Sequence, residues 1–267
     1  MIKTKSRIFN ISSANAINSA FKSKVNVTLP DLTFHLDNIQ NAYISINQCE
    51  VANSFYVINY TNDVIVINSI AYTLPRGNYN VNTFIAQLLL LIPVGFGITY
   101  SSITTKFTFT NTTTNFTINA SSSASTINSV IGLGTTDITS TALSLTLPYV
   151  VNFLPLQRIN FRSNFLKLNN YNSADNSSDV FLSLQNNAPQ NSVIYYVNQT
   201  NSKTLIEDRN ITSFVITVTD DDNNLINFNN IDWYLTFQID MEYLEAPKLT
   251  NLSSIIQQGI IQPNTLQ

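Results

Sequence analysis

The amino-acid sequence predicts an all-β protein, and three observations carry this prediction. Residues 233–243 alternate apolar and polar side chains without a break, as a strand with one buried face does. Short apolar runs separated by Asn, Ser, Gly and Pro recur along the chain, roughly a dozen of them. Only one stretch has a helical period. This combination is typical of a β-sandwich or a β-barrel.

The best-specified strands are residues 211–218 and 233–243. Their core-facing positions are Phe214, Ile216 and Val218 in the earlier strand and Trp233, Leu235, Phe237, Ile239, Met241 and Tyr243 in the later one. Between them, residues 220–224 read Asp-Asp-Asp-Asn-Asn, which is a turn by composition because Asp and Asn bond their own backbone. We therefore expect these two strands to be partners.

The one helix is expected to begin near Thr83. Asn80 or Asn82 is in position to cap it, because an Asn side chain accepts bonds from the first free N–H groups of a helix. Phe84, Leu88 and Leu91 would form its apolar stripe, and the segment from Pro93 to Gly97 would end it.

The polar surface is predicted to hold few charges. Of 267 residues, 44% are hydrophobic and 11% are charged, whereas about 25% charged is usual. Few ionised groups then need to be desolvated when a neighbour covers the surface, which favours a protein that is packed against others. A genome rich in A and T would produce the same Asn and Ile bias without any functional meaning. The net charge of −3 argues against a broad basic surface for nucleic acid.

Several other classes of protein are excluded on composition. A single cysteine, Cys49, allows no internal disulfide framework and no metal cluster built on cysteines. The first residues do not resemble a secretory signal. The apolar run 88–92 ends at Pro93 and is much shorter than the roughly 20 residues of a membrane span. We expect no bound cofactor or metal.

Candidate catalytic groups are scarce, so we expect a protein that is not an enzyme. His35 has no evident acid partner, and Cys49 is expected to be a buried or half-buried filler rather than a nucleophile. The acids at 220–222 lack the glycine bend of a calcium loop. Asp240 and Glu242 share the outward face of a strand, where surface carboxylates are commoner than a pair that cleaves a sugar bond. The six glycines form no phosphate-binding loop.

The chain is expected to comprise a basic N-terminal arm (1–24), one sandwich domain (25–246) and a C-terminal tail (247–267). The arm carries basic residues without a core, and the tail carries apolar pairs without a partner. Arg158 and Arg162 share one strand face, as a salt-bridged surface or as a clamp for a carboxylate of another subunit. The candidate assembly contacts are therefore Lys3, Lys5, Arg7, Lys22, Lys24, Arg158, Arg162, Ile255, Ile256, Ile260 and Ile261.

The order of several motifs resembles a known family. The motifs are Val25-Asn-Val-Thr-Leu-Pro, Asn53-Ser-Phe-Tyr-Val-Ile, Leu74-Pro-Arg-Gly-Asn-Tyr, Ile98-Thr-Tyr, Lys106-Phe-Thr-Phe-Thr, Ile159-Asn-Phe-Arg-Ser-Asn-Phe-Leu, Val215-Ile-Thr-Val-Thr-Asp and Asn230-Ile-Asp-Trp-Tyr-Leu-Thr-Phe. In this order they resemble the jelly-roll minor capsid (penton) proteins of virophages, polinton-like viruses and related large DNA viruses. The resemblance spans residues 25–243. The double jelly-roll major capsid proteins of these viruses share such features but are usually about twice as long, which favours a single jelly roll.

The resemblance implies a single jelly-roll sandwich of two antiparallel sheets, with five copies around each fivefold vertex of a virion. Its implied partners are further copies of the chain and the major capsid protein, and other minor capsid proteins are additional expected partners. On the residues alone, the basic N-terminal arm is either a solvated, disordered terminus or an arm that lies along a neighbouring subunit or touches encapsidated nucleic acid. Two alternatives stay open on the residues alone. A carbohydrate- or receptor-binding sandwich would also be all-β and rich in Asn and Thr, and a glycan-cleaving enzyme would need two buried carboxylates in one cleft.

Overall fold

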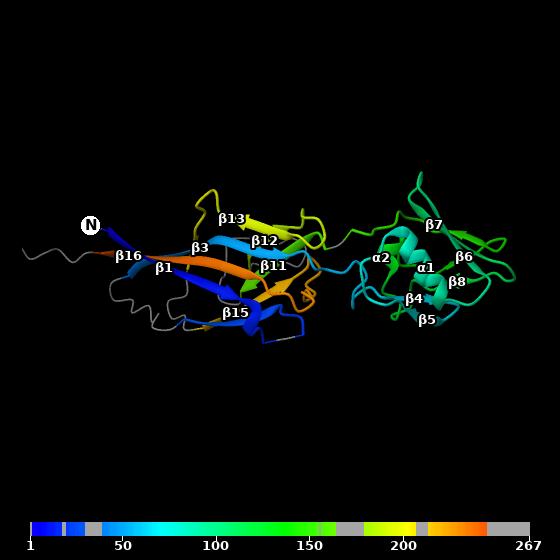
Figure 1. Ribbon diagram of the computed structural model, residues 1–267, viewed down its shortest axis with the longest axis horizontal. Coiled ribbons are helices and arrows are strands. Elements are labelled where there is room, and N and C mark those ends of the chain that lie inside the picture. Colours follow the sequence, from blue (N-terminus) through cyan, green and yellow to red (C-terminus); the bar gives the residue numbers. More distant parts are fainter. Residues whose placement is uncertain are drawn as a thin grey trace, which may run out of the picture.

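The computed structural model describes residues 2–17, 20–29, 39–154, 156–163, 179–206 and 213–244. Within these residues the regular secondary structure consists mostly of antiparallel strands, with two short α-helices and one 3-10 turn. Figure 1 shows two lobes joined by a pair of connecting segments. The all-β prediction is confirmed.

The larger lobe is a sandwich of two sheets. One sheet has the order β1-β16-β3-β13, with β14 also paired to β3, and the other has the order β12-β11-β15-β2. The strands are β1 (Ile2–Ser12), β2 (Lys24–Thr28), β3 (Ile39–Ala52), β11 (Arg158–Ser163), β12 (Val180–Gln185), β13 (Val193–Val197), β14 (Thr204–Leu205), β15 (Ser213–Thr219) and β16 (Tyr234–Leu244). A 3-10 turn, η1 (Ser13–Asn15), follows β1.

The strand pairing of this lobe is that of a jelly roll. If β13 and β14 are taken as one position, the first strand pairs with the last (β1 with β16), the second with the last but one (β2 with β15), and so on inward (β3 with β13/β14, β11 with β12). The pairs then alternate between the two sheets. This nested pairing is how a jelly roll wraps one long hairpin into a sandwich.

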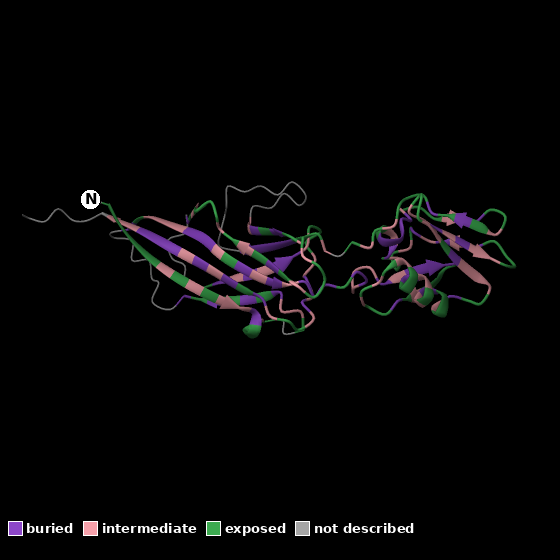
Figure 2. Cartoon of the chain, turned by 45° about the horizontal axis from the view of Figure 1, so that its top comes forward, coloured by how far each residue is buried: buried purple, intermediate pink, exposed green. Residues whose placement is uncertain are grey.

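The core of the jelly roll lies between the two sheets, where side chains from both meet. Phe161 of β11 packs edge-on against Trp233, with ring centroids 5.2 Å apart, and Phe214 of β15 lies 5.9 Å from Phe237 of β16. The alternation predicted for 233–243 is confirmed over 233–241, whose five odd positions are all buried, while Tyr243 is only partly buried against the same core. Figure 2 shows the same alternation as stripes along the strands.

One prediction about these strands is wrong. The strands β15 and β16 are consecutive in the sequence, but they lie in opposite sheets and are not partners. The segment between them turns at residues 220–224 and then crosses the end of the sandwich. Their apolar faces therefore meet across the core instead of lying side by side in one sheet.

The smaller lobe is formed by a continuous piece of chain inserted between β3 and β11. Its sheets have the orders β10-β7-β6 and β5-β4-β8-β9. The elements are β4 (Val64–Ile67), β5 (Ile70–Thr73), α1 (Val81–Leu91), β6 (Phe96–Ser101), β7 (Lys106–Asn111), β8 (Thr117–Ile118), α2 (Asn128–Ile131), β9 (Ile138–Thr139) and β10 (Ser144–Thr146). The lobe has a hydrophobic core of its own, in which Phe84 stacks on Phe107 with ring centroids 5.5 Å apart.

The predicted helix is confirmed as α1. Asn80 is its N-cap and accepts a bond from the backbone N–H of Thr83, whose side chain accepts one from the backbone of Asn80 in return. This reciprocal arrangement is a capping box. The second helix, α2, ends at Gly132 with φ of 77°, a left-handed conformation that glycine adopts at little cost. A Cβ at this position would lie 2.3 Å from the carbonyl oxygen of Tyr149.

The two hydrophobic cores divide the chain at different residues from the domain boundaries expected from the sequence. Residues 2–12 do not form an arm outside the sandwich, because β1 pairs with β16 over its whole length and Phe9 and Ile11 pack against the jelly-roll core. Residues 57–153 supply the second core, so the region 25–246 holds two cores. The tail 247–267 lies outside the described residues.

Candidate assembly surfaces and inter-lobe pocket

The basic residues of β1 face the core side of an edge strand. Lys3, Lys5 and Arg7 occupy the same alternation as Phe9, and Lys5 is in register with the buried Met241 of β16. Charged residues at inward positions of an edge strand oppose uncontrolled pairing with other strands. Figure 1 shows the N-terminal end of β1 at the end of the jelly roll remote from the small lobe.

Lys22 ties the β1–β2 connection to the start of β16. Its ammonium lies 2.7 Å from Oδ1 of Asp232, which also accepts a bond of 2.8 Å from the hydroxyl of Ser13. The bond from Lys22 is the main reason that the pKa of Asp232 lies below its usual value. The indole N–H of Trp233 donates to the carbonyl of Lys22 over 2.8 Å. Lys22 therefore has a structural role within the chain.

The other basic candidates differ in exposure. Lys24 is exposed on β2, and Arg158 is exposed at the start of β11. Arg162 is buried, with its guanidinium 2.8 Å from Oδ1 of Asp179 and its Nε donating to the hydroxyl of Thr219 over 2.9 Å. Arg162 therefore makes a salt bridge within the chain, whereas Arg158 remains on the surface. The four isoleucines of the tail lie outside the described residues.

The groups considered for catalysis that the structure describes lie on two strands, Cys49 on β3 and Asp240 with Glu242 on β16. His35 falls outside the described residues. Cys49 is fully buried in β3, and its burial raises the pKa of the thiol far above the usual range. Asp240 was expected on the surface, but this expectation is wrong, because the residue is 2% exposed beneath Lys203. Glu242 accepts a bond of 3.0 Å from the amide of Asn41.

The acidic turn at 220–224 is closed by its own bonds. Oδ1 of Asp220 accepts from the backbone N–H groups of Asp222, at 3.0 Å, and Asn224, at 2.8 Å. Burial raises the pKa of Asp220 in spite of these bonds. Among the residues that the structure describes, no group of three or more His, Cys, Asp or Glu side chains could hold a metal ion.

The edge strand β13 presents exposed apolar side chains. Val193, Tyr195 and Val197 are 58%, 58% and 45% exposed and share one face of the sheet. Within its sheet, β13 pairs with β3 on one side, and its other side is a sheet edge. Exposed apolar residues at a sheet edge mark a surface able to pair with another chain. The position of β13 at a sheet edge is set by tertiary pairing and leaves no local signal in the sequence.

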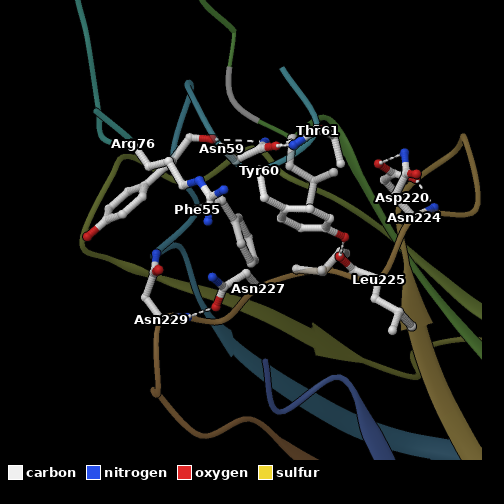
Figure 3. A pocket seen from close by; sticks show the side chains of 13 residues that line it. Phe55, Asn59, Tyr60, Thr61, Arg76, Asp220, Asn224, Leu225, Asn227 and Asn229 are labelled. Carbon is white, nitrogen blue, oxygen red and sulfur yellow. Dashed lines mark hydrogen bonds between the residues drawn. The ribbon is translucent and has the colours of Figure 1, made fainter. Parts of the chain in front are cut away.

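A pocket of about 200 Å³ lies where the two lobes meet. The small lobe contributes Tyr56, Asn59, Tyr60, Thr61 and Arg76, and the jelly roll contributes the connection between β15 and β16. The full lining is Phe55, Tyr56, Asn59, Tyr60, Thr61, Arg76, Leu156, Asp220, Asn224, Leu225, Ile226, Asn227 and Asn229. Figure 3 shows amide side chains and aromatic rings around one space.

Tyr60 links the two lobes at this pocket. Its hydroxyl donates to the carbonyl of Leu225 over 2.5 Å, and its ring lies 4.9 Å from that of Phe21. Burial, together with the nearby charge of Asp220, raises the pKa of the phenol. Because a small-lobe side chain is held by two jelly-roll segments, the pocket wall is fixed on both sides. The sequence did not predict this pocket, since its residues come from four separated stretches.

No helix within the described residues is long and apolar enough to cross a membrane. No protein family and no curated protein sequence matches the chain. Among solved structures, the chain is similar to the crystal structure of the selenomethionine-labelled penton protein of mavirus. The match covers 89% of this chain and 99% of that protein, with a TM-score of 0.46 and 12% sequence identity.

Proposed function

We propose that the protein is a structural subunit of a virus capsid, a minor capsid (penton) protein located in the virion. In this role five copies surround each fivefold vertex and contact the major capsid protein. The proposal rests on the nested strand pairing of the larger lobe, in which the pair β1–β16 is outermost and the pair β11–β12 is innermost. This pairing makes the larger lobe a jelly roll. Capsid proteins are one of the main classes built on this fold, and the motif order along the sequence points to the same class.

The polarity of the molecule supports this role. The small lobe extends from one end of the jelly roll, and the N-terminal end of β1, where Lys3 and Lys5 lie, is at the opposite end (Figure 1). A subunit standing upright in a shell would direct Lys3, Lys5 and Arg7 inward, where cations can displace counterions from the phosphates of a genome. The small lobe would then face outward.

The sides of the jelly roll supply surfaces for neighbours. Only 11% of all residues are charged, so covering a side of the molecule desolvates few ionised groups. The exposed face of β13 offers Val193, Tyr195 and Val197 to a neighbouring subunit. Arg158, Lys24 and the apolar tail residues Ile255, Ile256, Ile260 and Ile261 are further contacts in this proposal, and other minor capsid proteins are additional partners.

The mass of the purified protein in solution tests the proposal. Five copies are expected, and co-expression with a major capsid protein is expected to place the pentamer in particles. The double substitution Val193→Lys and Val197→Lys should yield monomers, because two charges would have to be buried at the subunit contact. Ile70→Lys, on an exposed residue of the small lobe, is the matched control and should leave the pentamer intact.

A wild-type protein that remains monomeric alone and with the major capsid protein would contradict the capsid role. It would favour a carbohydrate- or receptor-binding sandwich. Loss of the pentamer in both variants would show that β13 is not a specific contact. The double variant must retain the tryptophan fluorescence spectrum of the folded protein, because Trp233 is the chain's single tryptophan and lies in the jelly-roll core.

A further inference from the structure

The inter-lobe pocket has the size of a site for one small molecule. Its volume of about 200 Å³ lies below the roughly 300–1,000 Å³ that drug-sized ligands occupy. Both lobes line it, and Tyr60 bonds one lobe to the other beside it. A preformed space of this size accepts a single ring with its substituents.

The walls of the pocket combine aromatic rings with amides. Tyr56 and Tyr60 line it next to the buried Phe55. Aromatic faces pack against the C–H groups of a sugar ring, as they do against other flat apolar surfaces. Four asparagines complete the lining. The amide nitrogens of Asn59, Asn224 and Asn229 each donate one bond within the chain, but every amide nitrogen carries a second N–H, so donors and acceptors for hydroxyl groups remain.

The amides are held in fixed orientations by local bonds. Oδ1 of Asn227 accepts from the backbone N–H of Asn229 over 2.9 Å, and Figure 3 shows its amide nitrogen turned toward the ring of Phe55. Oδ1 of Asn59 accepts from the backbone and the hydroxyl of Thr61, at 2.8 and 2.7 Å. Because these side chains are already ordered, a ligand would immobilise few of them on binding, which favours affinity.

The charges around the pocket argue against an anionic ligand. Arg76 lies at the rim, but its Nε is 2.9 Å from Oδ2 of the buried Asp63. Asp220 lines the same space. With Asp63 included, one cation is opposed by two carboxylates, so a phosphate or an acidic sugar would meet net repulsion.

From this geometry we propose that the inter-lobe pocket binds one neutral sugar ring, free or at the end of a glycan. A tyrosine face would cover one side of the ring, while Asn227 and its neighbouring amides bond the hydroxyls. The site is independent of the capsid role, because none of its residues lies on β13. Its failure and the failure of the capsid role are therefore distinguishable.

Saturation-transfer NMR on the full chain tests the site. The probes are glucose, galactose, mannose, fucose, N-acetylglucosamine and N-acetylgalactosamine at millimolar concentration, with N-acetylneuraminic acid as the anionic comparator. At least one neutral sugar should receive saturation, and the anionic one should not. Tyr56→Ala removes an aromatic wall, and Asn227→Asp keeps the acceptor for Asn229 but removes the amide donor. Each should weaken binding at least tenfold.

Two variants serve as controls. Tyr234→Ala removes an exposed tyrosine from β16, and Asn201→Asp changes an exposed asparagine, both away from the pocket lining. Both should leave sugar binding unchanged. No transfer to any neutral sugar would overturn the proposal, and so would preferential binding of N-acetylneuraminic acid or transfer that persists in both pocket variants. The mass of each variant in solution is measured in parallel and should equal that of the wild type.

Discussion

The strands that pair in the jelly roll include the first and the last of the chain, whereas the strands that pair in the small lobe are close together in the sequence. In the jelly roll, β1 pairs with β16 so that Ile2 lies opposite Leu244. In the small lobe, β4 and β5 form a hairpin in which Ile67 lies opposite Ile70, and β6 and β7 follow each other directly. Each lobe has a separate hydrophobic core. The small lobe is therefore a local unit, whereas the jelly roll is closed only when its first and last strands meet.

This difference teaches where each lobe is vulnerable. Loops that bring distant strands together cost entropy before their contacts form, so a fold closed by its outermost strands depends on all of them. A lobe made from one continuous stretch depends only on that stretch. Damage to β1 or β16 should therefore unfold the jelly roll and leave the small lobe folded.

Deleting residues 1–12 is expected to have the largest effect. The deletion removes the whole of β1, including Phe9, whose ring stacks on Phe237 at 5.0 Å. The free energy of unfolding of the jelly roll should fall by more than the roughly 3–5 kcal/mol that one large aromatic costs. Fluorescence of Trp233 during denaturation measures this lobe alone, since the chain has one tryptophan.

The neighbouring residues of β1 provide a matched control for the deletion. Phe9→Ser removes a side chain packed against the core, whereas Ile8→Ser alters one that is 60% exposed. Only the first should lower the fluorescence midpoint. An unchanged midpoint after the deletion would mean that β1 is an arm after all, as its basic composition suggested.

Truncating one aromatic side chain in each core should show that the two lobes unfold independently. Phe237→Ala and Phe107→Ala each remove a fully buried ring and should cost about 3–5 kcal/mol. The loss should appear in the Trp233 transition for the first, and in hydrogen exchange of α1 and β7 for the second. Tyr234→Ala, at an exposed position of β16, should cost within about half a kcal/mol. If Phe107→Ala shifted the tryptophan transition equally, the two lobes would unfold as one unit.

The sequence predicted what is decided locally. Asn80 and Thr83 are three residues apart and cap α1 without help from distant chain, so the helix was found within two residues of its start. The alternation of 233–243 likewise shows which side chains are buried, because the pleat fixes the faces of a strand.

The errors came from contacts that sequence order does not reveal. The strand β1 was interpreted as an arm because Lys3, Lys5 and Arg7 occupy the positions where apolar residues would signal a strand. The pairing of β15 with β16 was expected because consecutive strands usually pair, but the chain crosses to the opposite sheet between them. Asp240 was placed at the surface because alternation shows that it lies on the outward face of the strand. Alternation does not show that another side chain covers that face. The pocket forms only where separate segments of the chain meet in the fold, so no sequence pattern could identify its residues together.

Asp240 tests a charged contact within the jelly roll. Burial acts to raise its pKa, but bonds from Lys203, Ser6 and Gln238 outweigh this effect and hold the pKa below the usual 3.8. A carboxylate with a lowered pKa stabilises the fold above its usual pKa, and that contribution is lost as the pH falls through the lower value. Asp240→Asn should cost about 1.5–3 kcal/mol at neutral pH.

The pH dependence distinguishes this role from a general loss of packing. As the pH falls through the usual value of 3.8 toward the lower pKa of the folded state, the stability advantage of the wild type over Asp240→Asn should shrink, because the carboxylate takes up its proton more readily in the unfolded chain than in the folded one. Glu242→Gln, on the same strand, is the control, because this carboxylate accepts its bond from the neutral amide of Asn41, and it should cost less than Asp240→Asn at neutral pH. An advantage independent of pH would show that the negative charge of Asp240 is not what stabilises the fold.

The smallest effect expected is at the cap of α1, and it should be confined to the small lobe. Asn80 accepts the backbone N–H of Thr83 over 3.0 Å, so Asn80→Ala leaves a helix N–H without its partner and should cost about 1 kcal/mol. Asn82 lies inside the first turn of the helix, and Asn82→Ala should cost nothing or stabilise slightly because alanine is the better helix former. Hydrogen exchange of the first turn of α1 measures both, with the Trp233 transition unchanged in each. Equal losses for the two variants would mean that Asn80 does not cap the helix in solution, and a shift in the tryptophan transition would show that local damage in the small lobe reaches the jelly roll.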